Sequence, residues 1–175
     1  ALSVEQATKN AARAAQAQRA LTAIIAALNS GATFETALQD LSASGVENIP
    51  TALSENAQGV APLLSLQADF PDTARAALSV ARAAGAEQSE TGVAAFLKRQ
   101  LSARSVAPRE GDDPDAVLSR AEAAVREGRV ADALTEIETL PAPVQDAMAD
   151  WLASARARAA TEAAVQDLSQ RLTAN

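Results

Sequence analysis

The stretch DPDAVLSRAEAAVREGRVADALTEIETL (113–140) decides the fold, because it encodes two amphipathic helices joined at one glycine. Asp113 is a good helix N-cap, and Pro114 suits the first helical position. Apolar residues then recur at helical spacing on both sides of Gly128. They are Val117, Leu118, Ala121, Ala124 and Val125 before it, and Val130, Ala133, Leu134 and Ile137 after it. The pattern predicts two helices packed face to face.

A long helix that starts near Pro143 is expected to cover this hairpin. Its stripe consists of Val144, Met148, Trp151 and Ala155. We expect Trp151 to pack across the hairpin with its indole N–H bonded to a polar group, and contact with a partner or with lipid is the alternative. Farther along, Arg158 and Glu162 are spaced as an i,i+4 pair, and a second apolar patch follows. The candidates for partner binding or self-association are Trp151, Arg158, Val165, Leu168 and Leu172.

Composition extends the helical prediction to the whole chain. Apolar residues make up 48% of it, largely alanine, and aromatic residues only 2%. Alanine is the best helix former, and the sequence has no Asn-Gly or Asp-Gly hairpin signal. Ala121 and Ala133 have the spacing of the small residues at which paired helices touch in tetratricopeptide repeats. We therefore predict an all-α bundle of short and medium helices, with a tetratricopeptide-like hairpin packed on a long C-terminal helix.

Glycine, proline and charge divide the chain into four predicted parts. Residues 1–30 form an N-terminal helix, either the end of a coiled-coil arm or a first lipid-binding helix. Residues 31–103 are a series of short helices, which includes a break at Pro71 and a helix over 91–104. Residues 104–113 are a linker, and residues 114–175 are a helical C-terminal module.

The N-terminal helix has a cationic polar side and an apolar end. Lys9, Arg13 and Arg19 stand against the single acid Glu5. The apolar residues, which continue into the next helix, are Leu21, Ile24, Ile25, Leu28, Phe34, Leu38 and Leu41. Such a segment can lie in a headgroup layer, where each basic residue contributes about 1 kcal/mol. These cationic and apolar residues are the candidates for lipid binding. Closure of a core or of a dimer interface is the alternative, and periodicity alone favours it.

Several function classes lack the residues that they need. The chain has no cysteine, histidine or tyrosine, which removes thiolate sites and the commonest general base and metal ligand. The acidic cluster EGDDPD (110–115) lacks the frame of a calcium loop, and no phosphate loop or nucleophile elbow occurs. Net charge is −7, and no basic patch with aromatic residues points to nucleic acid. We predict a protein without catalytic residues, metal or cofactor.

Residues 111–158 resemble the C-terminal domain of the mitofilin family. The shared features are the helix that starts at Asp-Pro, the turn REGRVADAL, the break at LP, and the tryptophan followed by ARAR. The resemblance implies a membrane-shaping scaffold, as in the organisation of cristae or intracytoplasmic membranes. It also implies an upstream transmembrane anchor and coiled coil, on the periplasmic side of a bacterial inner membrane or in the mitochondrial intermembrane space.

The same resemblance implies partners. A lipid-binding segment within 5–41 would meet an anionic phospholipid membrane, while the acidic C-terminal module would form a homodimer or higher oligomer or bind a protein partner. The alternative is a helical protein–protein adapter without lipid contact.

Overall fold

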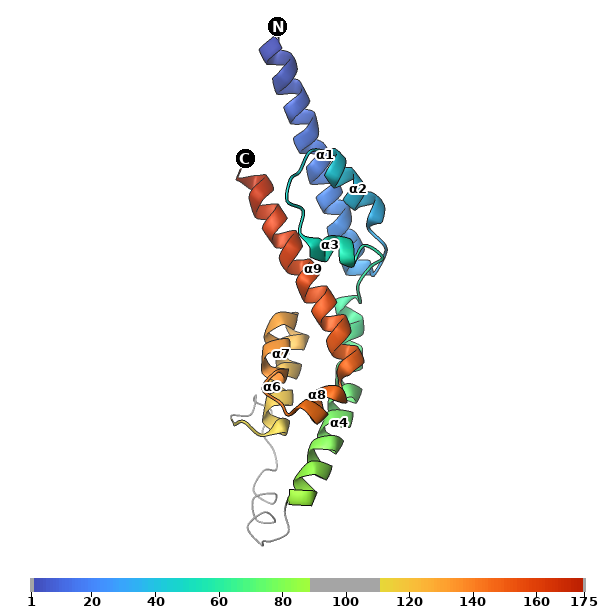
Figure 1. The fold of residues 1–175 in the computed structure, drawn as a ribbon, viewed down its shortest axis with the longest axis vertical. Coiled ribbons are helices and arrows are strands. Elements are labelled where there is room, and N and C mark those ends of the chain that lie inside the picture. Colours follow the sequence, from blue (N-terminus) through green and yellow to red (C-terminus); the bar gives the residue numbers. More distant parts are fainter. Residues whose placement is uncertain (1, 89–110, 175) are drawn as a thin grey trace. The chain divides into compact units, whose positions relative to one another are not determined.

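Every regular element that the structure describes is an α-helix, which confirms the predicted all-α class. The structure is a computed structural model, and it describes residues 2–88 and 111–174 (Figure 1). The predicted helix over 91–104 and most of the predicted linker over 104–113 lie outside the described residues.

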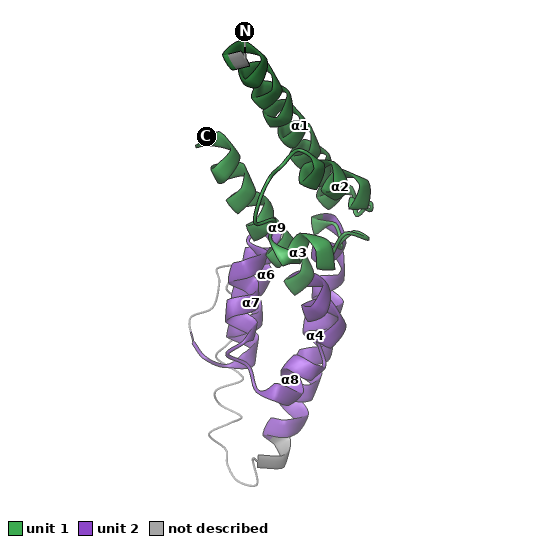
Figure 2. Ribbon diagram, turned by 45° about the horizontal axis from the view of Figure 1, so that its top comes forward, with its two compact units in different colours: residues 1–63, 156–175 green, residues 64–155 purple. Residues whose placement is uncertain are grey.

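The chain forms two compact units (Figure 2). Unit 1 comprises Ala1–Leu63 and Arg156–Asn175, and unit 2 comprises Leu64–Ala155. This division differs from the predicted module boundaries at residues 30 and 114. The difference arises because the second apolar patch of the last helix buries its side chains among those of the N-terminal helices.

Unit 1 is built from α1 (Leu2–Ser30), α2 (Glu35–Ala43), α3 (Thr51–Glu55) and the later part of α9 (Ala149–Thr173). Its core combines residues from all four helices, from the segment before α2 and from the turn after α3: Ala17, Ala20, Leu21, Ile24, Ala27, Phe34, Leu41, Leu53, Ala57, Ala164, Val165 and Leu168. Gly59 has φ +108°, and a Cβ there would lie 2.7 Å from the carbonyl oxygen of Gly31. Only glycine fits this close approach of two backbone segments.

Unit 2 contains most of α4 (Leu63–Gln88), α6 (Pro114–Arg126), α7 (Val130–Ile137), α8 (Ala142–Asp146) and the first part of α9. The predicted stripes of α6 and α7 are buried, and these two helices pack together as the predicted hairpin. Asp113 caps α6 by accepting the Ala116 N–H at 3.1 Å. The Arg120 side chain donates to Glu136 across the hairpin at 2.9 Å, and this hydrogen bond raises the pKa of Arg120.

Helix α4 runs through Pro71, so the predicted break at this proline is wrong. Proline removes one backbone hydrogen bond from a helix interior. Leu66 and Phe70, one turn apart on the N-terminal side, are both buried in unit 2. The Gln67 side chain also donates to the carbonyls of Val125 and Arg126, which end α6. These tertiary contacts keep α4 continuous despite the local signal.

Candidate functional site

The first half of α1 is an exposed arm. Residues 3–15 are exposed on every face of the helix, and the start of the arm projects beyond α2 and the end of α9 (Figure 1). Val4 is 68% exposed. Lys9 is paired with Glu5 at 2.6 Å, whereas Arg13 and Arg19 have no ion pair among the described residues. The three predicted cations are therefore at the surface, with two of them available to an anion.

The apolar residues predicted to face lipid lie mainly in the core of unit 1. The fully buried ones are Leu21, Ile24, Leu28, Phe34 and Leu41. Leu38 is partly buried against the same core, and Ile25 is 38% exposed. In this conformation five of the seven are buried, and Leu21, Ile24, Phe34 and Leu41 belong to one core cluster with residues of α3 and α9. The alternative reading of the sequence, that they close a core, describes their place in the structure.

Arg158 is a buried cation that joins α9 to the end of α1. Its side chain is 4% exposed, and its Nη1 donates to the carbonyl oxygens of Leu28 at 3.0 Å and Ala61 at 3.2 Å. Its Nη2 lies 2.8 Å from Glu162, the predicted i,i+4 partner. The last carbonyls of a helix lack intrahelical partners and carry partial negative charge. Arg158 thus satisfies one carbonyl in the last turn of α1, a turn that has no basic residue of its own.

Arg171, in the last turn of α9, makes similar hydrogen bonds to backbone carbonyls. Its Nη1 and Nη2 donate to the carbonyls of Glu47 and Asn48 at 3.3 and 3.0 Å, and Nη2 lies 2.9 Å from Asp167. These carbonyls belong to the 44–48 loop, in which Gly45 has φ +85° and Asn48 has φ +53°. The guanidinium holds the loop against the C-terminal half of α9.

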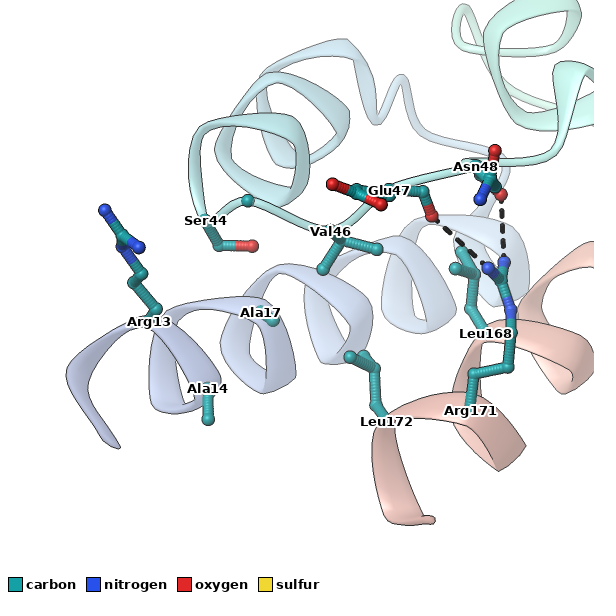
Figure 3. Close-up of a pocket in the computed structure, with 11 residues that line it drawn as sticks. Arg13, Ala14, Ala17, Ser44, Val46, Glu47, Asn48, Leu168, Arg171 and Leu172 are labelled. Carbon is teal, nitrogen blue, oxygen red and sulfur yellow. Dashed lines mark hydrogen bonds between the residues drawn. The ribbon is translucent and has the colours of Figure 1, made fainter. Parts of the chain in front are cut away.

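A half-open pocket of about 400 Å³ lies where the arm, the 44–48 loop and α9 meet (Figure 3). Its apolar lining comes from Ala14, Ala17, Val46, Leu168 and Leu172. The polar side chains around it are Arg13, Ser44, Glu47, Asn48 and Arg171. Of the sequence-predicted residues, the pocket brings together Arg13 from the lipid-binding set and Leu168 and Leu172 from the self-association set.

The residues assigned to self-association are all buried or partly buried. Trp151 is 5% exposed, its Nε1 donates to the Leu66 carbonyl at 3.0 Å, and its ring meets Phe70 edge-on with centroids 5.0 Å apart. This confirms the expected burial and the polar partner; both neighbours belong to α4, and packing across the 114–140 hairpin stays a prediction. Val165 and Leu168 are buried in unit 1, and Leu172 is partly buried there.

Sequence reasoning missed the 44–48 loop and Arg171. The i,i−4 spacing of Arg171 and Asp167 was a signal for an ion pair, but the main acceptors of Arg158 and Arg171 are backbone carbonyls. Every residue has a carbonyl, so no pattern of residue types marks one as an acceptor.

The described residues contain neither a metal-ligating cluster nor a membrane span. No group of three or more acidic side chains converges among residues 2–88 and 111–174, and none of the helices there is both long and apolar enough to cross a bilayer. No protein-family model, curated protein or solved structure matches the chain. The resemblance to the mitofilin family therefore stays a prediction.

Proposed function

We propose that this chain is a membrane-shaping scaffold whose exposed N-terminal arm contacts an anionic phospholipid surface, while the rest of the chain holds copies or partner proteins. The observation that carries the proposal is the arm itself, in which residues 3–15 are all exposed and three cations lie within 9–19. The resemblance of 111–158 to the mitofilin family supports the same function.

The distribution of charge along the chain restricts which part can contact an anionic bilayer. Residues 111–175 carry 6 basic and 12 acidic side chains, a net charge of −6, so an anionic surface repels this part. The arm and the following turn carry three bases and one acid. At about 1 kcal/mol per basic residue near such a surface, their net attraction is roughly 2 kcal/mol.

An attraction of this size does not hold one copy on a membrane. Linked copies gain affinity through their raised effective concentration, without any new contact. We infer that membrane binding depends on self-association, which is the behaviour of a scaffold rather than of a monomeric lipid-binding protein.

The second candidate is a helical protein–protein adapter that does not meet lipid. The burial of Leu21, Ile24, Leu28, Phe34 and Leu41 favours it, since these were the strongest apolar residues of the predicted lipid face. The two functions differ in what the arm binds.

Co-sedimentation with vesicles tests the choice. The chain is mixed with vesicles of phosphatidylglycerol and phosphatidylcholine at low and at physiological salt. We expect retention that rises with the anionic fraction and falls with salt. The variant Lys9→Gln, Arg13→Gln and Arg19→Gln is expected to lose most of it.

The matched control carries the same loss of charge elsewhere, at three exposed arginines: Arg75→Gln, Arg82→Gln and Arg156→Gln. It is expected to bind like the unaltered chain. No retention on anionic vesicles at any salt, or an equal loss in both variants, would refute membrane contact by the arm. The first result would leave the adapter function as the explanation.

A further inference from the structure

We propose that the pocket of unit 1 binds a zwitterionic headgroup in which a primary ammonium accompanies a phosphate, as in phosphoethanolamine lipids, with the start of the acyl chain against the apolar lining. The inference deepens the proposed function and rests on it, because a membrane supplies this ligand. It is carried by the charges and the lining of the pocket.

Two side chains of opposite charge at the pocket have no ion-pair partner among the described residues: Arg13 on α1 and Glu47 on the loop (Figure 3). Of the other polar groups, Ser44 and the Nη atoms of Arg171 are engaged, whereas Arg171 Nε is buried without a hydrogen-bond partner among the described residues. The Ser44 hydroxyl donates to the Leu41 carbonyl at 2.6 Å, and the Nη atoms of Arg171 are bound to loop carbonyls and Asp167. A ligand with one charge would leave either Arg13 or Glu47 unpaired. A zwitterion pairs with both.

The Glu47 carboxylate and the non-aromatic lining of the pocket determine which cation the ligand carries. A carboxylate is an acceptor only, and a primary ammonium offers three N–H donors. A quaternary ammonium has no such donor and is recognised by the faces of aromatic rings. None of the residues that line the pocket is aromatic. The site therefore favours ethanolamine over choline.

The lining accounts for the apolar part of the ligand. The volume of about 400 Å³ is within the range of small-molecule sites, in which a few polar groups converge on a mainly apolar wall. Ala14 and Ala17 on α1 face Leu168 and Leu172 on α9, and their small side chains leave the space between the two helices open.

The experiment uses the whole chain and three lysolipids below their micelle concentrations: lysophosphatidylethanolamine, lysophosphatidylcholine and lysophosphatidylglycerol. Calorimetry or chemical-shift titration gives the affinities. We expect the ethanolamine lipid to bind about tenfold more tightly than the other two, the factor that one charge-assisted hydrogen bond supplies. Glu47→Gln should abolish this preference, and Arg13→Gln should weaken the phosphate-bearing lipids alike.

The matched pair Ala14→Phe and Ala11→Phe tests the place of binding. Both alanines are exposed on α1, but only Ala14 lines the pocket. We expect Ala14→Phe to reduce the affinity more than tenfold with unchanged helicity, and Ala11→Phe to leave it unaltered. Equal affinity for the three lysolipids, or equal effects of the two variants, would overturn the site. Phosphoethanolamine that binds as tightly without its chain would overturn the role of the apolar lining.

The outcomes separate this inference from the proposed function. Retention on anionic vesicles that depends on the arm, without lysolipid discrimination, refutes the pocket and supports the scaffold. Lysolipid binding at the pocket, without vesicle retention, supports the pocket and refutes the scaffold.

Discussion

Replacement of Arg158 by leucine removes the buried cation of unit 1 while keeping an apolar side chain in its place. The substitution breaks three contacts, two to the carbonyls of Leu28 and Ala61 and one to Glu162. The buried carbonyl of Leu28 then loses the guanidinium donor, and an unsatisfied buried polar group costs about 1–3 kcal/mol; the part-buried carbonyl of Ala61 costs less because water can reach it. The carboxylate of Glu162 is 36% exposed and regains water, so its share is small.

Two effects reduce this cost. The unaltered chain buries Arg158 Nε without a partner among the described residues, and its guanidinium has lost its hydration, so the removal of Arg158 relieves an existing penalty. Leucine also buries apolar surface worth about 1.5–3 kcal/mol. Two unsatisfied carbonyls less the burial of leucine leave roughly 0.5–3 kcal/mol, and the relieved desolvation lowers this further, so we predict a loss of about 1–2 kcal/mol in the free energy of unfolding.

Urea denaturation followed by far-ultraviolet circular dichroism measures this loss. The control is Arg156→Leu, which removes the same charge from an exposed position two residues away and should change the stability by less than about 0.5 kcal/mol. Glu162→Gln should lower it by less than about 1 kcal/mol. An Arg158→Leu chain as stable as the Arg156→Leu chain would refute the assignment of Arg158 as the cap of α1.

Three further substitutions test the described packing. Trp151→Ala should lower the stability by about 3–5 kcal/mol. Trp151→Phe should lower it by about 1–2 kcal/mol, because it keeps the contact with Phe70 but loses the bond to the Leu66 carbonyl. Thermal unfolding measures both losses, and a loss below about 1 kcal/mol for Trp151→Ala would mean that the ring is exposed. Gly59→Ala should be more destabilising than Gly45→Ala. Both glycines have positive φ, but only a Cβ at Gly59 would contact other backbone atoms, at 2.7 Å from the carbonyl oxygen of Gly31. Equal losses of stability in urea titrations would contradict this close approach. Asp113→Ala should lower the stability by about 1 kcal/mol through the lost cap of α6, with Asp113→Asn near neutral, and equal losses for the two would exclude capping.

Unit 2 shows what the sequence can predict. The cap at Asp113, the apolar stripes of α6 and α7 and the end at Gly128 are local features, and each indicates the same hairpin. Pro71 shows the opposite case, since its local signal predicts a break that buried neighbours on α4 override. Helix signals are predictive where local preference and tertiary packing agree.

Unit 1 is less predictable because its parts are distant in sequence. The periodicity of Leu21, Ile24 and Leu28 identifies an apolar face but not what covers it. The cover includes Val165 and Leu168, which the sequence places at the far end of the chain. Neither the two-unit division nor the pocket between α1, the loop and α9 has a signature within one window of residues.

The free energies involved also distinguish two modes of membrane binding, insertion of the apolar face and contact through the cations of the arm. Insertion of the predicted apolar face would expose and transfer Leu21, Ile24, Leu28, Phe34 and Leu41, which now form core contacts. At about 1.5–3 kcal/mol for each buried side chain, opening unit 1 gives up roughly 10 kcal/mol before any lipid contact is made. The cations on the arm need no such opening, because they already lie at the surface. Their attraction is weak in one copy but is available in the folded chain. Contact through the arm is therefore the lower-energy route, and it predicts that the helicity of unit 1 stays unchanged and that its urea midpoint does not fall when anionic vesicles bind.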